Sequence, residues 1–356
     1  MNVTINKNVL EHILVNTQSF LEKKDSSHIT SHLLINVYDN TFNVKATDHE
    51  IGLSVDSTNV AIQENGLATA NGRKLLDIVK ILKDDDINIR VEDDNLLVTQ
   101  KKSKYKLPMF NPNEFPEFPT LENKSQFKID SFNFLKSIKK ISPAIDTNNP
   151  KYELNGALID IQDDSISFVA TDTKRLAISS QPLNNQLDIQ NLNIIIPKKA
   201  ISEIQKLFFD EIEIFYDENL LIIKTDSFYF FTKLINGKFP DYKRIIPQNT
   251  KYELTLNREK IIEAIKQIAI VSPEIKITFQ NDLIIFESLN ENEAKTQLDF
   301  LSNIEEELFL DINSKHILDF LSNIEKNEFK LRYNDSSLPF MVESENFKTV
   351  IMPIIT

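Results

Sequence analysis

Residues 42–48 read FNVKATD and residues 166–172 read ISFVATD, and this recurrence decides the fold. The offset between the two segments is 124 residues (166 − 42). One offset that holds along a whole segment of the chain indicates a duplicated domain. Further segments recur at the same offset: LINV at 34–37 with LIDI at 158–161, and FPEF at 115–118 with FPDY at 239–242.

A third copy follows and is recognised by the spacing of its apolar residues. In each copy a short opening strand is followed by two apolar residues four positions apart, which places them on one buried face of a helix. A second helix with an apolar face follows later in each copy, and alternating segments such as residues 219–224 predict antiparallel strands covered on one face. The helical pairs are Leu10 and Leu14, Phe134 and Ile138, and Ile261 and Ile265.

The repeat predicts three α+β domains, at residues 1–122, 123–249 and 250–356. Each domain should contain two helices and about eight strands in antiparallel sheets. Copies of one domain joined head to tail close into a ring where the rotation permits it. Three copies would close alone or as half of a ring of two chains.

Composition excludes several classes of function. The chain has no Cys, so disulfides, thiolate nucleophiles and Cys-based metal sites are excluded. Its five Gly residues stand apart, and neither a GxGxxG nor a Walker A sequence is present to hold a nucleotide. No apolar run approaches the roughly 20 residues of a membrane span, and no signal peptide opens the chain, so we expect a cytoplasmic protein.

The formal net charge of −13 conceals a separation of charges. Acidic runs fall in predicted turns, at residues 84–86, 93–94, 163–164 and 305–307. They lack the spacing of an EF-hand, so solvated turns are favoured over metal sites. Basic residues fall in predicted helices and would give a cationic face that neutralises DNA phosphates without reading bases. Ordinary solvation is the alternative for any single one: Arg73, Lys74, Lys80, Lys83, Lys136, Lys139, Lys140, Lys198, Lys199, Lys206, Arg258, Lys260 and Lys266.

Four segments resemble the bacterial DNA sliding clamp, the β subunit of DNA polymerase III, and the resemblance covers the whole chain. It implies a homodimeric ring with helices lining the lumen, which encloses double-stranded DNA and acts as a polymerase processivity factor. The resemblance further implies that the chain is not an enzyme and holds no cofactor, and that its partners are the polymerase, an ATP-driven clamp loader and other clamp-motif proteins. The segments are YELNG at 152–156, ATDTKRLA at 170–177, KLINGKFPDYKRIIP at 233–247 and VIMP at 350–353.

The resemblance also implies a cleft that accepts short, largely hydrophobic peptides. Leu, Met and Pro side chains suit an adaptable apolar cleft, and Arg175 and Arg244 would donate hydrogen bonds at its rim. Without the resemblance, Leu154 and Met352 would be read as core residues. The implied cleft residues are Leu154, Thr171, Lys174, Arg175, Leu176, Pro240, Arg244, Ile245, Val350, Met352 and Pro353.

Two further sets of residues follow from the same resemblance. Lys24, Arg73, Tyr152 and Lys198 are implied to contact DNA. An edge-strand pairing with apolar anchors is implied at the join between two chains. Its anchors are Tyr105, Leu107, Ile270 and Val271.

The chain departs from the family pattern around the cleft. Thr173 and Lys174 stand where the family commonly has Gly-His, and Glu153 replaces one of two adjacent tyrosines. Many members end in Met-Pro-Met-Arg-Leu, whereas this chain ends in residues 352–356 (MPIIT). Loss of the terminal Arg removes a cation from the cleft edge, so we expect a shifted preference for peptide motifs.

Two alternatives belong to other classes. A hydrolase or transferase needs a cluster of catalytic groups, but the His residues are scattered and the pair Thr171-Asp172 recurs as Thr47-Asp48, which favours a structural turn. A protein-binding scaffold that never encloses DNA is the second alternative, and the sequence separates it poorly from a clamp. The His residues are His12, His28, His32, His49 and His316.

Overall fold

The computed structural model describes residues 1–127, 130–162, 165–182, 192–209, 211–301, 304 and 306–355. The predicted acidic turn at 163–164 and Glu305 lie outside these residues. The chain forms two compact units: residues 1–131 with 206–234, and residues 132–205 with 235–356. The units follow the sheets and not the repeat, so the domain boundaries after residues 122 and 249 stay predictions.

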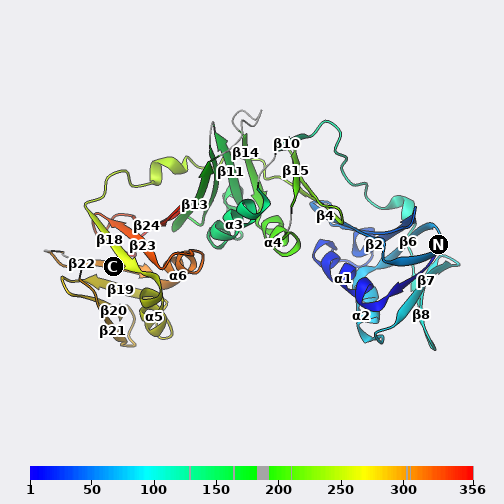
Figure 1. The fold of residues 1–356 in the computed structure, drawn as a ribbon, viewed down its shortest axis with the longest axis horizontal. Coiled ribbons are helices and arrows are strands. Elements are labelled where there is room, and N and C mark those ends of the chain that lie inside the picture. The colour runs from blue at the N-terminus through cyan, green and yellow to red at the C-terminus, as the bar shows by residue number, and fades with distance from the viewer. Residues whose placement is uncertain are drawn as a thin grey trace. The chain divides into compact units, whose positions relative to one another are not determined.

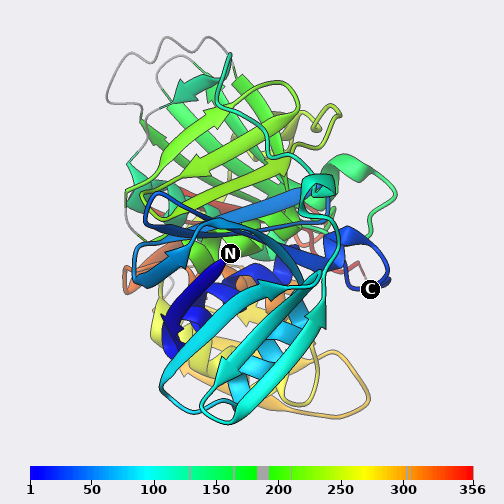
Figure 2. The ribbon, with the colours of Figure 1, turned by 90° about the vertical axis from the view of Figure 1, so that its right-hand side faces the viewer.

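The first unit contains two antiparallel sheets, ordered β5-β1-β7-β8-β9 and β10-β15-β16-β17-β4-β3-β2-β6. Figure 2 shows the five-stranded sheet in front, with the helices of this unit behind it. The helices are α1 (Lys7–Thr17) and α2 (Gly72–Ile81). The strands are β1 (Asn2–Asn6), β2 (His32–Tyr38), β3 (Thr41–Thr47), β4 (Ile51–Ser57), β5 (Val60–Glu64), β6 (Gly66–Asn71), β7 (Asp86–Glu92), β8 (Asn95–Gln100), β9 (Ser103–Pro108), β10 (Ser125–Phe127), β15 (Glu213–Tyr216), β16 (Leu220–Lys224) and β17 (Phe228–Lys233).

The second unit also contains two antiparallel sheets, ordered β14-β11-β12-β13-β25-β24-β23-β18 and β21-β20-β19-β22. Its helices are α3 (Ser131–Ile141), α4 (Lys198–Leu207), α5 (Arg258–Ala269) and α6 (Ser314–Ser322), as Figure 1 shows. The strands are β11 (Gly156–Gln162), β12 (Ser165–Thr171), β13 (Arg175–Pro182), β14 (Leu192–Pro197), β18 (Tyr252–Asn257), β19 (Glu274–Phe279), β20 (Leu283–Ser288), β21 (Lys295–Asp299), β22 (Leu308–Asn313), β23 (Glu328–Tyr333), β24 (Phe340–Ser344) and β25 (Phe347–Ile351).

Asparagine side chains fix where four of the helices begin. Asn6, Asn71, Asn257 and Asn313 precede α1, α2, α5 and α6, and each accepts a hydrogen bond from a backbone N–H of the first turn. Such a cap satisfies one of the donors that the first helical turn leaves free. The apolar pairs predicted four residues apart are buried on α1, α3 and α5.

The structure confirms the duplicated domain and the α+β class. α1 and α3 have 11 residues each and begin at Lys7 and Ser131, at the offset found in the sequence. β2 and β11 begin at His32 and Gly156, again at that offset. The third copy repeats the order of elements from β18 to β25 around α5 and α6.

Successive copies are joined by strand pairing. β17 pairs with β4, with Phe231 opposite Gly52, and β13 pairs with β25, with Leu176 opposite Val350. In both joins the third strand after the first helix of one copy meets the third strand after the second helix of the next copy. None of the helices in the described ranges is long and apolar enough to cross a membrane.

Gly156, at the start of β11, is expected to tolerate no side chain. We expect Gly156→Ala to lower the free energy of unfolding by about 1–3 kcal/mol, because its methyl group would lie 2.6 Å from the backbone oxygen of Ile196. Gly237→Ala is the matched control, since its nearest neighbour would be Glu153 Cβ at 3.5 Å. Urea denaturation measures both, and equal stability of the two variants would contradict the close approach.

Candidate peptide-binding cleft

The pairing of β13 with β25 brings together two motifs that are far apart in the sequence. Arg175 lies opposite Ile351 and Leu176 opposite Val350. The pairing continues past the strand, because the backbone N–H of Met352 donates to the carbonyl of Lys174 at 2.9 Å. The C-terminal segment is therefore held against the turn that carries Lys174.

Leu154, Leu176 and Val350 form part of one buried apolar cluster. Each is 2% exposed, and the cluster also contains Phe239 and Tyr242. These three predicted cleft residues thus form the apolar layer beneath the surface. Leu154 is therefore a core residue in the structure.

Beside this cluster lies a hollow of about 510 Å³. Lys174, Met352 and Pro353, all predicted from the sequence, lie in its lining, and Met352 is 39% exposed. Sequence reasoning missed the other residues, because Glu274, Asn313 and His316 approach the C-terminal segment through β22, where the backbone N–H of Ile354 donates to the carbonyl of Asp311 at 2.7 Å. The missed residues are Thr173, Glu274, Asn313, His316, Ile354 and Ile355.

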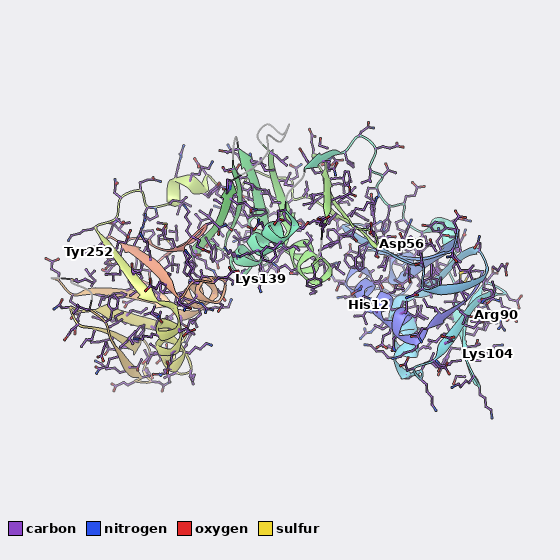
Figure 3. The ribbon with its side chains drawn as sticks, viewed as in Figure 1. His12, Asp56, Arg90, Lys104, Lys139 and Tyr252 are labelled. Atoms are coloured by element: carbon purple, nitrogen blue, oxygen red, sulfur yellow. The ribbon has the colours of Figure 1, made fainter. Side chains whose placement is uncertain are left out.

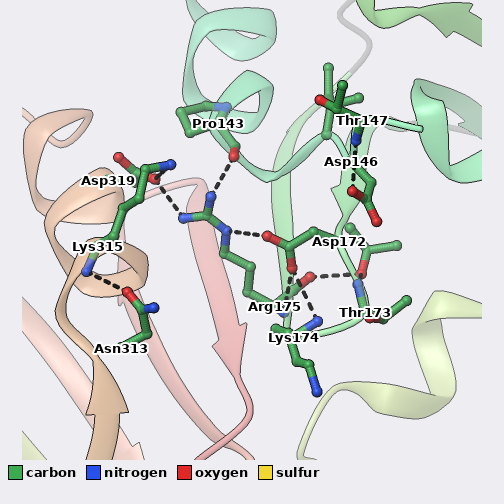
Figure 4. A network of polar contacts seen from close by, with 12 residues as sticks. Pro143, Asp146, Thr147, Asp172, Thr173, Lys174, Arg175, Asn313, Lys315 and Asp319 are labelled. Atoms are coloured by element: carbon green, nitrogen blue, oxygen red, sulfur yellow. Dashed lines mark hydrogen bonds and ion pairs between the residues drawn. The ribbon is translucent and has the colours of Figure 1, made fainter. Parts of the chain in front are cut away.

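Arg175 is buried behind the hollow and its guanidinium is fully engaged (Figure 4). Nε donates to Asp172 Oδ2 at 2.9 Å and Nη1 to Asp319 Oδ2 at 2.7 Å. Nη2 donates to the carbonyl of Pro143. Arg175 therefore ties the turn after β12 to α6, and its donors face protein groups and not the rim.

The turn at residues 171–175 is held by short-range hydrogen bonds. Asp172 Oδ1 accepts from the backbone N–H groups of Lys174 and Arg175, at 3.1 and 2.9 Å. Thr171 Oγ1 donates to the carbonyl of Arg175 at 2.7 Å. Thr173 has φ 70°, a conformation that favours Gly and is strained for a β-branched residue. Gly would adopt this conformation without strain.

His316, on α6, contributes a neutral ring to the hollow. Burial lowers the pKa of His316, and the positive charge of Arg175 lowers this pKa further. The carboxylates of Asp172 and Asp319 act in the opposite direction without reversing the shift. At neutral pH the imidazole is therefore uncharged and suited to contact with an apolar ligand.

Pro240, Arg244 and Ile245 lie on a separate segment next to the apolar cluster. Arg244 and Ile245 belong to a short 3-10 helix, η6 (Tyr242–Ile245), whose first residue is part of the cluster. The Arg244 side chain is 85% exposed and forms an ion pair with Asp241 at 2.7 Å. Ile245 is 45% exposed, so this segment presents both side chains to solvent.

The residues implied to contact DNA differ in their exposure and in their hydrogen bonds within the chain. Arg73 is exposed and lines a hollow of about 460 Å³ with Lys23 and Lys74, and Lys24 is adjacent in the chain. Tyr152 is 67% exposed. The Lys198 ammonium instead donates to the carbonyl of Ile145 at 2.8 Å and to Thr147 Oγ1.

Most of the basic helix residues are exposed, with two corrections. Lys139 extends from the exposed face of α3 (Figure 3), but Lys140 is buried and was wrongly assigned to that face. Its ammonium donates to Asn346 Oδ1 at 2.8 Å and lies over the ring of Phe347, and burial lowers the pKa of Lys140. Lys83 lies beyond the end of α2 at Ile81.

The residues implied at the join between chains lie at edges. Tyr105 and Leu107 belong to β9, an edge strand of its sheet, and Leu107 is buried. Ile270 and Val271 follow the end of α5 and are 88% and 37% exposed. Exposed aliphatic side chains of this kind are typical of a contact surface.

The family is established by the whole length of the chain. Residues 1–119, 128–241 and 243–355 match the models of the N-terminal, central and C-terminal domains of the DNA polymerase III beta subunit. The chain belongs to this family of sliding clamps. It is a processivity factor of DNA replication, and the hydrolase or transferase alternative is set aside.

Individual relatives agree in sequence and in structure. The beta sliding clamp of Helicobacter pylori strain J99 is 34% identical over 372 residues, covering 99% of this chain and 100% of the relative. The crystal structure of the Helicobacter pylori beta clamp bound to a DNA ligase peptide is 36% identical with a TM-score of 0.95, and the match covers 100% of both chains. The DNA polymerase III beta subunit of Pseudomonas aeruginosa is 28% identical with a TM-score of 0.91, again over 100% of both chains.

The two predicted rim arginines should differ sharply in their contribution to stability. We expect Arg175→Met to lower the free energy of unfolding by about 3 kcal/mol, because Asp172, Asp319 and the Pro143 carbonyl each lose the hydrogen bond that Arg175 donates. Arg244→Met removes one exposed ion pair and should change the free energy of unfolding by less than about 1 kcal/mol. Thermal unfolding of both variants measures the difference, and comparable losses would contradict the assignment of Arg175 to the interior.

Proposed function

We propose that two copies of the chain close into a ring around double-stranded DNA and tether client proteins through the cleft. The clients are the replicative polymerase and other clamp-motif proteins, and an ATP-driven loader opens the ring. Replication of bacterial DNA takes place in the cytoplasm, which we propose as the compartment. The observation that carries the ring is the repeated way in which successive copies join.

Each join within the chain pairs equivalent strands. β4 pairs with β17 and β13 pairs with β25. The next strand in this series is β21, and the first strand of the other series is β9. Both are edge strands in the described sheets. If β21 of one copy pairs with β9 of a second copy, the join between chains repeats the joins within the chain. Two chains that pair in this way at both ends close a ring.

The chemistry of these two edges is complementary. β9 carries the exposed Lys104 and Lys106, and Lys104 extends from the strand in Figure 3. Acidic residues flank or end β21: Glu291, Glu293 and Asp299. Opposite charges steer the association of two surfaces, and apolar anchors at Tyr105, Leu107, Ile270 and Val271 would supply the buried core of the interface.

Exposed cations on the helices support binding to the DNA backbone. Contacts of this kind neutralise phosphates, weaken with salt and carry no sequence information. We propose Lys24, Arg73 and Tyr152 as contacts. Lys198 joins them only by exchanging its bonds to Ile145 and Thr147 for a phosphate.

The hollow and the adjoining segment support a site for an extended apolar peptide. Met352 and Pro353 give the hollow an apolar wall, and Met adapts its shape to different ligands. The Helicobacter pylori relative was solved with a DNA ligase peptide, which supports peptide binding by this chain. We propose the eleven residues implied by the resemblance as its site, with Arg175, Leu154, Leu176 and Val350 acting from beneath.

Shortening the wall of the hollow should abolish client tethering. We expect Met352→Ala combined with Pro353→Ala to remove stimulation of the cognate polymerase on primed DNA, because the apolar surface offered to the peptide is lost. The dimer, measured by analytical ultracentrifugation, should persist because the hollow that these residues line contains no described residue of β9 or β21. Unchanged stimulation would mean that the cleft lies elsewhere.

Enclosure of DNA separates a clamp from a scaffold that does not encircle it. The chain, loaded on nicked circular DNA by a clamp loader, should be retained on the circle in gel filtration and lost once the circle is cut. A variant with Ile270→Asp and Val271→Asp, at two positions that are exposed in the single chain, should fail to be retained, because charges buried in the proposed join disrupt it. Retention on linear DNA would contradict enclosure.

A further inference from the structure

A buried carboxylate lies beneath the segment that carries Arg244 and Ile245. Asp160, on β11, is 4% exposed. Its Oδ2 accepts a hydrogen bond from the Tyr242 hydroxyl at 2.7 Å and lies 3.5 Å from Lys243 Nζ. Its Oδ1 is buried and has no hydrogen-bond partner among the described residues.

Burying an ionisable side chain lowers the stability of the fold, so filling space alone does not account for Asp160. A buried charge needs partners to offset its loss of hydration, and an apolar residue of similar size would fill the space without that need. Both partners of Asp160 come from consecutive residues of η6, Tyr242 and Lys243. The polar contacts of Asp160 are therefore directed at one short segment.

A second hydrogen bond connects η6 to the same face of β11. Lys243 Nζ also donates to Gln162 Oε1 at 2.6 Å. Asp160 and Gln162 are two residues apart on β11, so their side chains stand on one face of the strand. Burial raises the pKa of the Tyr242 hydroxyl, and its bond to Asp160 raises this pKa further, so the hydroxyl remains a donor.

These contacts fix the orientation of η6. With Tyr242 held inward by its ring in the apolar cluster and by its hydroxyl on Asp160, the following residues Arg244 and Ile245 point into solvent. Phe239 before η6 and Ile246 after it also pack on the apolar cluster, but these apolar contacts have no preferred direction. The hydrogen bond adds a direction that packing does not supply.

We propose that Asp160 and Tyr242 are a positioning pair that sets the wall of the peptide cleft formed by Arg244 and Ile245. The inference rests on the proposed function, because it assumes that a peptide is bound there. The pair touches no ligand itself. It determines affinity by holding the two exposed side chains in the orientation that a peptide meets.

The test uses truncations of the two side chains and a labelled peptide. The probe is a fluorescent peptide with the sequence of the DNA ligase peptide in the Helicobacter pylori complex, and its anisotropy gives Kd for the full chain. We expect Tyr242→Phe to raise Kd about fivefold to tenfold, because one hydrogen bond that orients the wall is lost. Asp160→Ala should have a similar effect, and the double variant should be no weaker than the single ones.

A second background separates positioning from general destabilisation. In a chain that already carries Arg244→Ala and Ile245→Ala, Tyr242→Phe should leave Kd unchanged, because the wall that it positions is gone. Tyr229→Phe is the matched control, since that hydroxyl also donates to a single acceptor, the carbonyl of Pro119, in the other unit. It should leave Kd unchanged, and thermal unfolding verifies that every variant is folded at the assay temperature.

The outcomes distinguish the two proposals. If Met352→Ala with Pro353→Ala abolishes peptide binding but Tyr242→Phe leaves Kd unchanged, the positioning pair is wrong and the cleft stands. A loss on Tyr242→Phe that persists in the Arg244→Ala and Ile245→Ala background also overturns the pair. Binding that ignores Met352→Ala with Pro353→Ala overturns the cleft and the pair together.

Discussion

The structure depends on edge strands of successive copies that pair through their backbones. The joins β4–β17 and β13–β25 use N–H and C=O groups that every residue except proline provides. Such joins tolerate wide changes of sequence, which explains why the third copy is hard to recognise by identity while its elements keep their order. At one position of the first join, the close approach requires a residue without a side chain. A Cβ on Gly52 would lie 2.2 Å from the Phe231 ring that crosses it in the first join.

The site inherits its geometry from the second join. Pairing β13 with β25 brings the turn at residues 171–175 to the C-terminal segment, and Arg175 then fastens this turn to α6 through Asp319. A buried guanidinium is costly unless its donors are used, and here all three nitrogens find acceptors. These hydrogen bonds restrict the movement of the turn relative to α6. The hollow is lined by the turn that carries Lys174, by β19, β22 and α6, and by the C-terminal segment, and Arg175 holds the turn against α6.

The sequence predicted those features that depend on spacing along the chain. The offset of the repeat and the buried faces of α1, α3 and α5 follow from local patterns. Features that depend on a distant neighbour escaped prediction. Lys140 has the spacing of an exposed residue, yet its ammonium meets Asn346, 206 positions away. The bond between Asp160 and Tyr242 spans 82 positions and has no local signature.

The residues that depart from the family pattern lie close to one another in the structure. Lys174, Ile354 and Ile355 line the same hollow. Lys174 lies on a turn whose shape is held by the bonds to Asp172, although Thr173 occupies a conformation that favours Gly. The C-terminal part of the lining is aliphatic. A peptide with an apolar end facing Ile354 and Ile355 and a hydrogen-bond acceptor facing Lys174 would match both parts of this lining.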